Sequence, residues 1–174
     1  MAFKRRLTSA RAAVRTIRVR RYAAAFLDAL IALTIALTPA ALAVRQGGEV
    51  QGRVFGAGLL VGTLYLLFRD GIPYAEWGAR SLGKRWLGVR PYRVDGTDVD
   101  WRVSVRRNAT VAAAFGIPAL AYAAGSYRGL PFDDLFVYAA LALAAVEAVL
   151  AGVDREGARL GDRWAGTRVT EARA

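Results

Sequence analysis

The segment from Arg21 to Val44 constrains the fold of this chain more than any other. After Asp28 it carries no charged residue until Arg45. About 20 apolar residues, at ~1.5 Å of rise each, match the roughly 30 Å thickness of a bilayer's hydrocarbon core. The segment therefore predicts a membrane-spanning helix with a carboxylate inside it.

Asp28 is the main candidate for a ligand or ion site. An aspartate inside a spanning helix costs roughly 2.5–3.5 kcal/mol, so such an acid indicates function by default. Arg21 lies seven residues earlier, which is about 20° short of two turns, so both side chains share one face of the helix. The alternative is that Asp28 pairs with a nearby arginine and contacts no ligand.

Three further apolar blocks, residues 54–68, 108–124 and 135–153, follow the first. Together the four blocks predict an all-α fold, a polytopic integral membrane bundle of four transmembrane helices. Residues 1–21, 69–107 and 154–174 hold 8, 9 and 5 of the 25 basic residues. The positive-inside rule then puts both termini in the cytoplasm of a multi-pass protein of the inner or plasma membrane. This topology accounts for the net charge of +11, so no nucleic-acid partner is expected.

Residues 1–20 have a helical apolar stripe among basic side chains. The stripe consists of Phe3, Leu7, Ala10, Val14 and Ile17. This pattern predicts a basic amphipathic interfacial helix that lies on the anionic lipids of the cytoplasmic leaflet. A solvated basic tail, or a signal peptide cleaved near residues 41–43, is the alternative.

Two more polar residues lie at a depth similar to that of Asp28. Glu147 in the fourth block and Thr63 in the second are both expected to lie roughly 10 Å below the cytoplasmic surface. With Arg21, these residues form the predicted ligand or ion site. The chain has neither Cys nor His, and its carboxylates show no metal-ligand spacing, so no metal and no cofactor are expected.

The polar segment 69–107 contains a basic, tryptophan-bearing stretch. Lys84 and Arg85, beside Trp86, predict a short helix at the membrane interface, and Arg107 is expected to be interfacial too. Loose alternation over residues 89–103, around Asp95-Gly96, predicts a small hairpin. Gly58 and Gly62 are spaced for close helix approach.

The ordered motifs resemble those of the RDD family of membrane proteins, named for one arginine and two aspartates. They are Arg21-Tyr22-x-Ala-x-x-Leu27-Asp28, Ser81-Leu82-Gly83-Lys84-Arg85-Trp86-Leu87-Gly88-Val89, Asp95-Gly96, Arg107-Asn108 and Arg159-Leu160-Gly161-Asp162-Arg163-Trp164-Ala165-Gly166-Thr167. The resemblance implies a helical membrane domain over residues 21–170, with Arg21, Asp28 and Asp162 as the name-giving residues. Residues 1–20 then form an added helix and residues 171–174 a tail.

Two functions fit these features. In the first, the protein takes part in transport of a small solute, or in cation or proton exchange, through a site around Asp28. In the second, it is a non-transporting scaffold or docking protein: an Arg21–Asp162 ion pair fixes the C-terminal segment, and the basic cytoplasmic face binds anionic lipid or a soluble partner. An enzyme is not expected, because no base beyond carboxylates accompanies the hydroxyl side chains. Four short helices with small residues often need partner copies to enclose a pathway, so a homo-oligomer is also a candidate.

Overall fold

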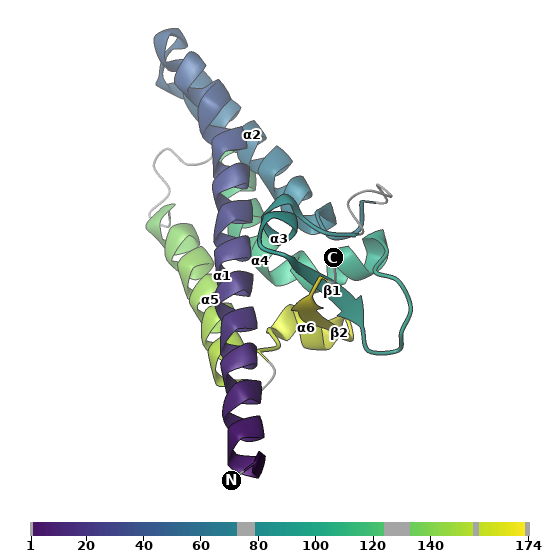
Figure 1. Ribbon diagram of the computed structural model, residues 1–174. Helices are drawn as coiled ribbons and strands as arrows, with labels where there is room; N and C mark the ends of the chain where they lie inside the picture. The colour runs from purple at the N-terminus through teal and green to yellow at the C-terminus, as the bar shows by residue number, and fades with distance from the viewer. Residues whose placement is uncertain (1, 73–78, 124–132, 155–156, 173–174) are drawn as a thin grey trace.

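The computed structural model describes residues 2–72, 79–123, 133–154 and 157–172, and within them the chain folds as two halves of the same order (Figure 1). Each half has two long helices, a five-residue helix and a strand. The first half comprises α1 (Ala2–Leu42), α2 (Gly48–Phe68), α3 (Leu82–Trp86) and β1 (Val89–Arg93), with the 3-10 turn η1 (Val44–Gln46) between α1 and α2. The second comprises α4 (Trp101–Ala123), α5 (Asp133–Val153), α6 (Leu160–Trp164) and β2 (Thr167–Glu171).

The short helix and strand of each half are copies of one motif. Residues 82–90 and 160–168 both follow the pattern Leu-Gly-x-Arg-Trp-x-Gly-x-Arg. The second glycine of each copy, Gly88 or Gly166, has a φ of about 63° or 62°, a left-handed conformation that glycine adopts without steric cost and that ends the helix before the strand. The two strands then pair with each other as an antiparallel ribbon, with Val89 opposite Glu171 and Arg93 opposite Thr167.

This ribbon corrects two expectations. The fold is mostly helical but not all-α, and the hairpin expected within residues 89–103 does not form, because β1 pairs with β2 from the end of the chain. Asp95 and Gly96 do lie in a turn, but residues 98–100 after it are not a strand. Asp100 instead accepts a hydrogen bond from the backbone N–H of Val103 at 2.8 Å, which caps the start of α4.

Two helices are long and apolar enough to cross a membrane: residues Thr16–Leu42 of α1, and α2. A shorter apolar stretch, Tyr138–Val153, lies in α5. Large apolar side chains on these helices point outward, among them Leu37, Leu64 and Leu141. Residues 124–132, between α4 and α5, lie outside the described residues.

The predicted glycine spacing forms a close contact between α1 and α2. A Cβ on Gly58 would lie 2.7 Å from Ala36 Cα, and one on Gly62 would lie 2.7 Å from the carbonyl oxygen of Ala32. The helices can therefore touch along their backbones only because these positions lack side chains. α4 also packs against α2, and Ala32 of α1, Leu66 of α2 and Ala112 of α4 form a small apolar cluster where the three helices meet.

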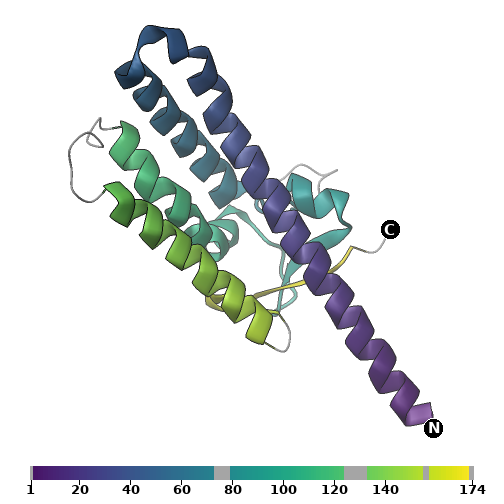
Figure 2. The same ribbon diagram turned by 90° about the vertical axis from the view of Figure 1, so that its left-hand side faces the viewer.

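α1 is one continuous helix, which differs from the expected division between residues 1–20 and the first span. The helix runs from Ala2 to Leu42 without a break, and its N-terminal part projects beyond the other helices (Figure 2). The side chains of residues 2–15 lie outside the described residues, as do residues 173–174 of the expected tail.

Candidate functional site

The interior of the protein is polar where the two halves meet. Among the largest fully buried side chains are Arg107, Asn108, Asp28, Asp70 and Asp162, whereas most of the buried apolar residues are alanines. We call the following set of buried, mutually bonded side chains the ion-pair network: Arg21, Asp28, Arg69, Asp70, Lys84, Arg107, Asn108, Arg159 and Asp162. Its members come from α1, α3, α4, α6 and the segments that follow α2 and precede α6.

Asp28 is fully buried, and both of its oxygens are occupied. Oδ1 accepts hydrogen bonds from Tyr65 Oη at 2.9 Å and from the backbone N–H of Gly83 at 3.0 Å. Oδ2 accepts from Arg69 Nη1 at 3.0 Å and from Ser81 Oγ at 2.6 Å. The carboxylate thus joins α1 to the end of α2 and to the start of α3.

Asp162 has three arginine partners. Its carboxylate contacts Arg21 of α1, Arg107 Nε of α4 at 2.7 Å, and Arg159 Nε at 3.6 Å. It also accepts from the backbone N–H of Arg159 at 3.0 Å, which caps α6. Although burial favours the neutral acid, these three cations lower the pKa of Asp162 far below its usual value, so it remains ionised.

Asp70 is the third buried acid. Lys84 Nζ lies 2.6 Å from its Oδ1, and Arg107 Nη1 lies 3.3 Å from its Oδ2. Burial would raise the pKa of Asp70, but Lys84, Arg107 and Arg69 together hold it well below the usual value. Burial, aided by the neighbouring arginines and opposed by Asp70, lowers the pKa of the Lys84 ammonium to about 7.

Positive charge exceeds negative charge in the ion-pair network. Five cationic side chains face three carboxylates, and the nearby Glu147 adds a fourth acid. Arg69 Nε, Arg107 Nη2 and Glu147 Oε2 have no hydrogen-bond partner among the described residues. The network therefore has a residual capacity to donate hydrogen bonds, in a place where unpaired groups are costly.

Two of the three residues expected at the lipid interface lie elsewhere. Lys84 and Arg107 are buried in the ion-pair network, and only Arg85 is exposed. The sequence assignment of Lys84 and Arg107 is therefore wrong. The reason is that α3 lies with one face against α1: the carbonyl oxygen of Ala24 lies so close to Gly83 that a Cβ there would overlap it. This contact turns Lys84 inward and leaves Arg85 and Trp86 outside.

The expected ligand-site residues are not brought together. Arg21 pairs with Asp162, while Asp28 pairs with Arg69. Thr63 donates to the carbonyl oxygen of Leu59 in its own helix and lines a separate apolar pocket, so its assignment to the Asp28 site is wrong. Glu147 is buried and accepts from Thr110 rather than sharing partners with Asp28.

The sequence did not predict Arg69 and Asp70 as site residues, and it gave Asn108 and Arg159 only as parts of family motifs, without a place in the site. Arg69 and Asp70 directly follow the second apolar block, where a charged pair is most simply explained as the start of a loop. For Lys84, whose burial was not predicted, the repeated Leu-Gly-x-Arg-Trp motif was a usable signal. Its variable position is Lys84 in one copy and Asp162 in the other, and both of these side chains enter the network.

Among the described residues no group of three or more acidic side chains is placed to hold a metal ion. Each network carboxylate instead faces arginine or lysine, so the arrangement is suited to joining segments or to exchanging an ion-pair partner.

Comparison with known proteins gives one family. The model of the RDD family matches residues 16–166. Comparisons with curated proteins and with solved structures gave no match. The family match confirms the resemblance of the ordered motifs, and it includes every member of the ion-pair network.

Proposed function

This chain belongs to the RDD family and is a membrane protein, and from that premise we propose that it acts as a membrane scaffold. In this proposal α1, α2, α4 and α5 all cross the inner or plasma membrane, with both termini in the cytoplasm. The segments α3, β1, α6 and β2 form what we call the cytoplasmic platform. The ion-pair network fastens this platform to the helices, and the platform binds anionic lipid or a soluble acidic partner.

The observation that carries this proposal is the state of Asp28. A transport site of the kind expected from the sequence needs a hydrated path to this carboxylate. Instead Asp28 is fully buried, and four donors occupy its two oxygens. Three of these donors lie outside the apolar helices: Arg69 follows α2, Ser81 precedes α3 and Gly83 lies in α3. Asp28 therefore joins the helices to the platform.

The exposed face of the platform supports a docking role. Each motif copy presents an arginine followed by a tryptophan, Arg85-Trp86 on α3 and Arg163-Trp164 on α6. Trp86 and Trp164 are 67% and 65% exposed, a high value for a side chain that is enriched in interfaces and at the headgroup level of membranes. Both arginines are exposed, and Arg163 also forms an ion pair with Asp154 at 2.6 Å. The positive charge beside each tryptophan favours an anionic partner.

Cysteine accessibility tests whether Asp28 is enclosed. Because the chain has no cysteine, Ser81→Cys places a single thiol beside Asp28, and Val94→Cys provides a matched control in the exposed turn after β1. With the protein in liposomes, we expect a charged, water-soluble thiol reagent to label position 94 rapidly and position 81 at least tenfold more slowly. Equal labelling rates would argue against an enclosed Asp28 and for a hydrated path to it.

Proton or cation exchange is the second candidate function, and Glu147 favours it. This acid is buried in α5, and its Oε2 has no hydrogen-bond partner among the described residues. A carboxylate of this kind inside a helix bundle is typical of proton relays. Liposomes that contain the protein should then show cation-driven proton flux. We expect Glu147→Gln to remove this flux and Arg90→Gln, at an exposed position of β1, to leave it unchanged. Identical flux in wild type and Glu147→Gln would dismiss this candidate.

A further inference from the structure

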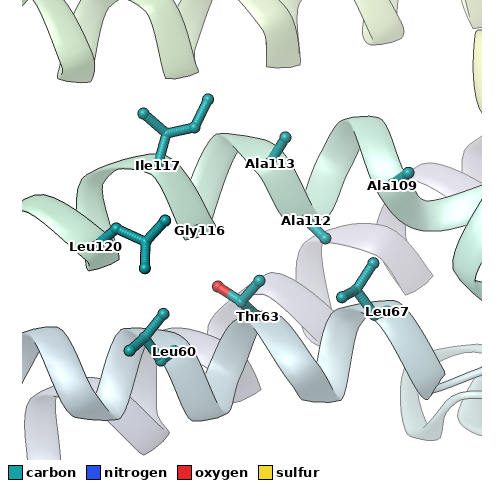
Figure 3. A pocket seen from close by; sticks show the side chains of 9 residues that line it. All are labelled: Leu60, Thr63, Leu67, Ala109, Ala112, Ala113, Gly116, Ile117 and Leu120. Carbon is teal, nitrogen blue, oxygen red and sulfur yellow. The ribbon is translucent and has the colours of Figure 1, made fainter.

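An apolar groove lies between α2 and α4, apart from the ion-pair network. Its volume is about 350 Å³. In Figure 3 Leu60, Thr63 and Leu67 lie on α2, and Ala112 and Leu120 point toward them from α4, whereas Ile117 points away from α2. The lining consists of Leu60, Thr63, Leu67, Ala109, Ala112, Ala113, Gly116, Ile117 and Leu120.

The one polar lining residue presents its apolar side. Thr63 donates its hydroxyl to Leu59 O at 2.8 Å, within α2. Its methyl group faces Gly116, where an added Cβ would lie 3.2 Å from Thr63 Cγ2. The groove thus offers hydrocarbon contacts along its whole length, and small side chains on α4 leave the space for an occupant.

Two exposed arginines continue the α4 side of the groove. At ~100° per residue, Arg102 and Arg106 fall on the same face of α4 as Ala109, Ala113 and Leu120. Arg106 precedes Ala109 by one turn, and Arg102 by two. Both arginines are exposed, and the Arg102 guanidinium stacks 5.2 Å from the ring of Trp101, a residue type enriched at the membrane–water boundary.

The length of the groove matches one leaflet. From Ala109 to Leu120 α4 rises about 16 Å, close to half of a hydrocarbon core of roughly 30 Å. In the proposed topology the arginine end faces the cytoplasm. An acyl chain in the groove would then place its headgroup at Arg106 and Arg102, where each arginine near the surface favours an anionic lipid.

We infer that this groove is a binding site for an anionic phospholipid of the cytoplasmic leaflet, with an acyl chain between α2 and α4 and the phosphate at Arg102 and Arg106. The inference rests on the proposed membrane topology. It does not involve the ion-pair network, since none of the groove residues belongs to it.

Native mass spectrometry of the full-length protein tests the headgroup part. The protein is released from vesicles of equal parts phosphatidylglycerol and phosphatidylcholine, and the retained lipid is weighed and identified. We expect preferential retention of phosphatidylglycerol. About 1 kcal/mol per arginine predicts a roughly fivefold lower preference in Arg106→Gln and a larger loss in the Arg102→Gln/Arg106→Gln double variant. The control Arg45→Gln, at an exposed position of η1 and outside the platform, should leave the preference unchanged.

Filling the groove tests the acyl-chain part. Ala113→Phe should prevent retention of both lipids, whereas Ala139→Phe, on an exposed face of α5, should not. Added inorganic phosphate should not compete; if it displaced the lipid, the hydrocarbon contacts would be unnecessary and the inference would fail. It would also fail if the arginine variants retained the wild-type preference, or if Ala113→Phe abolished a dimer and left lipid retention unchanged.

The lipid-retention test and the labelling test of the scaffold proposal can fail separately. The variants lie outside the ion-pair network, so loss of lipid selectivity leaves labelling at position 81 unchanged. Conversely, an accessible thiol in Ser81→Cys would refute the enclosure of Asp28 without altering lipid retention. Because Arg102 and Arg106 are exposed, their replacement by glutamine should leave folding intact even if Ala113→Phe does not.

Discussion

Asp162→Asn provides the sharpest test of the ion-pair network. The substitution keeps the shape of the side chain and removes its charge. Asp162 is fully buried and contacts Arg21, Arg107 and Arg159, so the variant leaves three cations near one another without their shared anion. It also weakens the cap of α6, because an amide oxygen replaces the carboxylate that accepts from Arg159 N.

The expected cost is large. Removing one partner of a buried ion pair typically destabilises a protein by about 3–5 kcal/mol, since an uncompensated charge stays buried. A neighbouring ion pair offers a matched control: Arg20 pairs with Glu171 at 3.5 Å, from the adjacent position of α1 to the same C-terminal segment. Its side chains are 45% and 54% exposed, and an exposed pair contributes only about 0–1 kcal/mol.

The free energy of unfolding of Asp162→Asn and Glu171→Gln, measured in the same lipid–detergent mixture, separates these cases. We expect the first to lose several times more stability than the second. The same loss in both variants, or none in Asp162→Asn, would refute the reasoning that Asp162 fastens the platform to α1 and α4.

Exchanging the charges of Arg21 and Asp162 is expected to fail as a rescue. A simple pair would recover when both residues are swapped. Here, however, Arg107 Nε lies 2.7 Å from the carboxylate of Asp162. An arginine at position 162 would therefore place a second positive charge directly beside Arg107. We therefore expect the double swap to remain unfolded, and recovery to wild-type stability would show that Arg21 is the only important partner.

Further predictions concern the two motif copies and pH. Gly161→Ala should abolish folding, because a Cβ at this position would overlap the backbone carbonyl of Arg107. Gly96→Ala has open space around it and should lower the free energy of unfolding by only about 1 kcal/mol, because of its positive φ. The yield of folded protein measures both effects. Stability should fall as pH drops below about 4, since Asp162 and Asp70 are ionised in the folded state and must take up protons that the unfolded chain binds more readily. Between pH 7 and about 10 the unfolded chain holds a proton on Lys84 that the folded chain tends to release, so the stability of the folded protein should rise with pH in this range. In Lys84→Met this rise should be absent. Melting curves of both proteins across the range test the prediction.

Much of the fold could be predicted from the sequence because hydrophobicity and charge act locally along the chain. The apolar run after Asp28 and the block before Arg69 correspond to the two helices long enough to cross a membrane. The spacing of Gly58 and Gly62 predicted a close helix contact, and the structure has one. The ordered motifs identified the RDD family, which the family match confirms.

The pairing of the polar residues could not be predicted in the same way. Depth along a helix placed Asp28, Thr63 and Glu147 at one level but not around one cavity, because depth fixes only one of three coordinates. Lys84 stands in a basic, tryptophan-bearing stretch that is typical of the membrane interface, and only the contact of α3 with α1 turns it inward.

The sequence by itself determined which segments avoid water and which carry positive charge, since each residue's own side chain sets those preferences. Only the tertiary structure decided that Asp28 meets Arg69 across 41 residues and that Asp162 meets Arg21 across 141. The physical reason is that a buried carboxylate requires a cation within a few ångströms, and which cation arrives there depends on how the helices pack. No side chain alone contains that information.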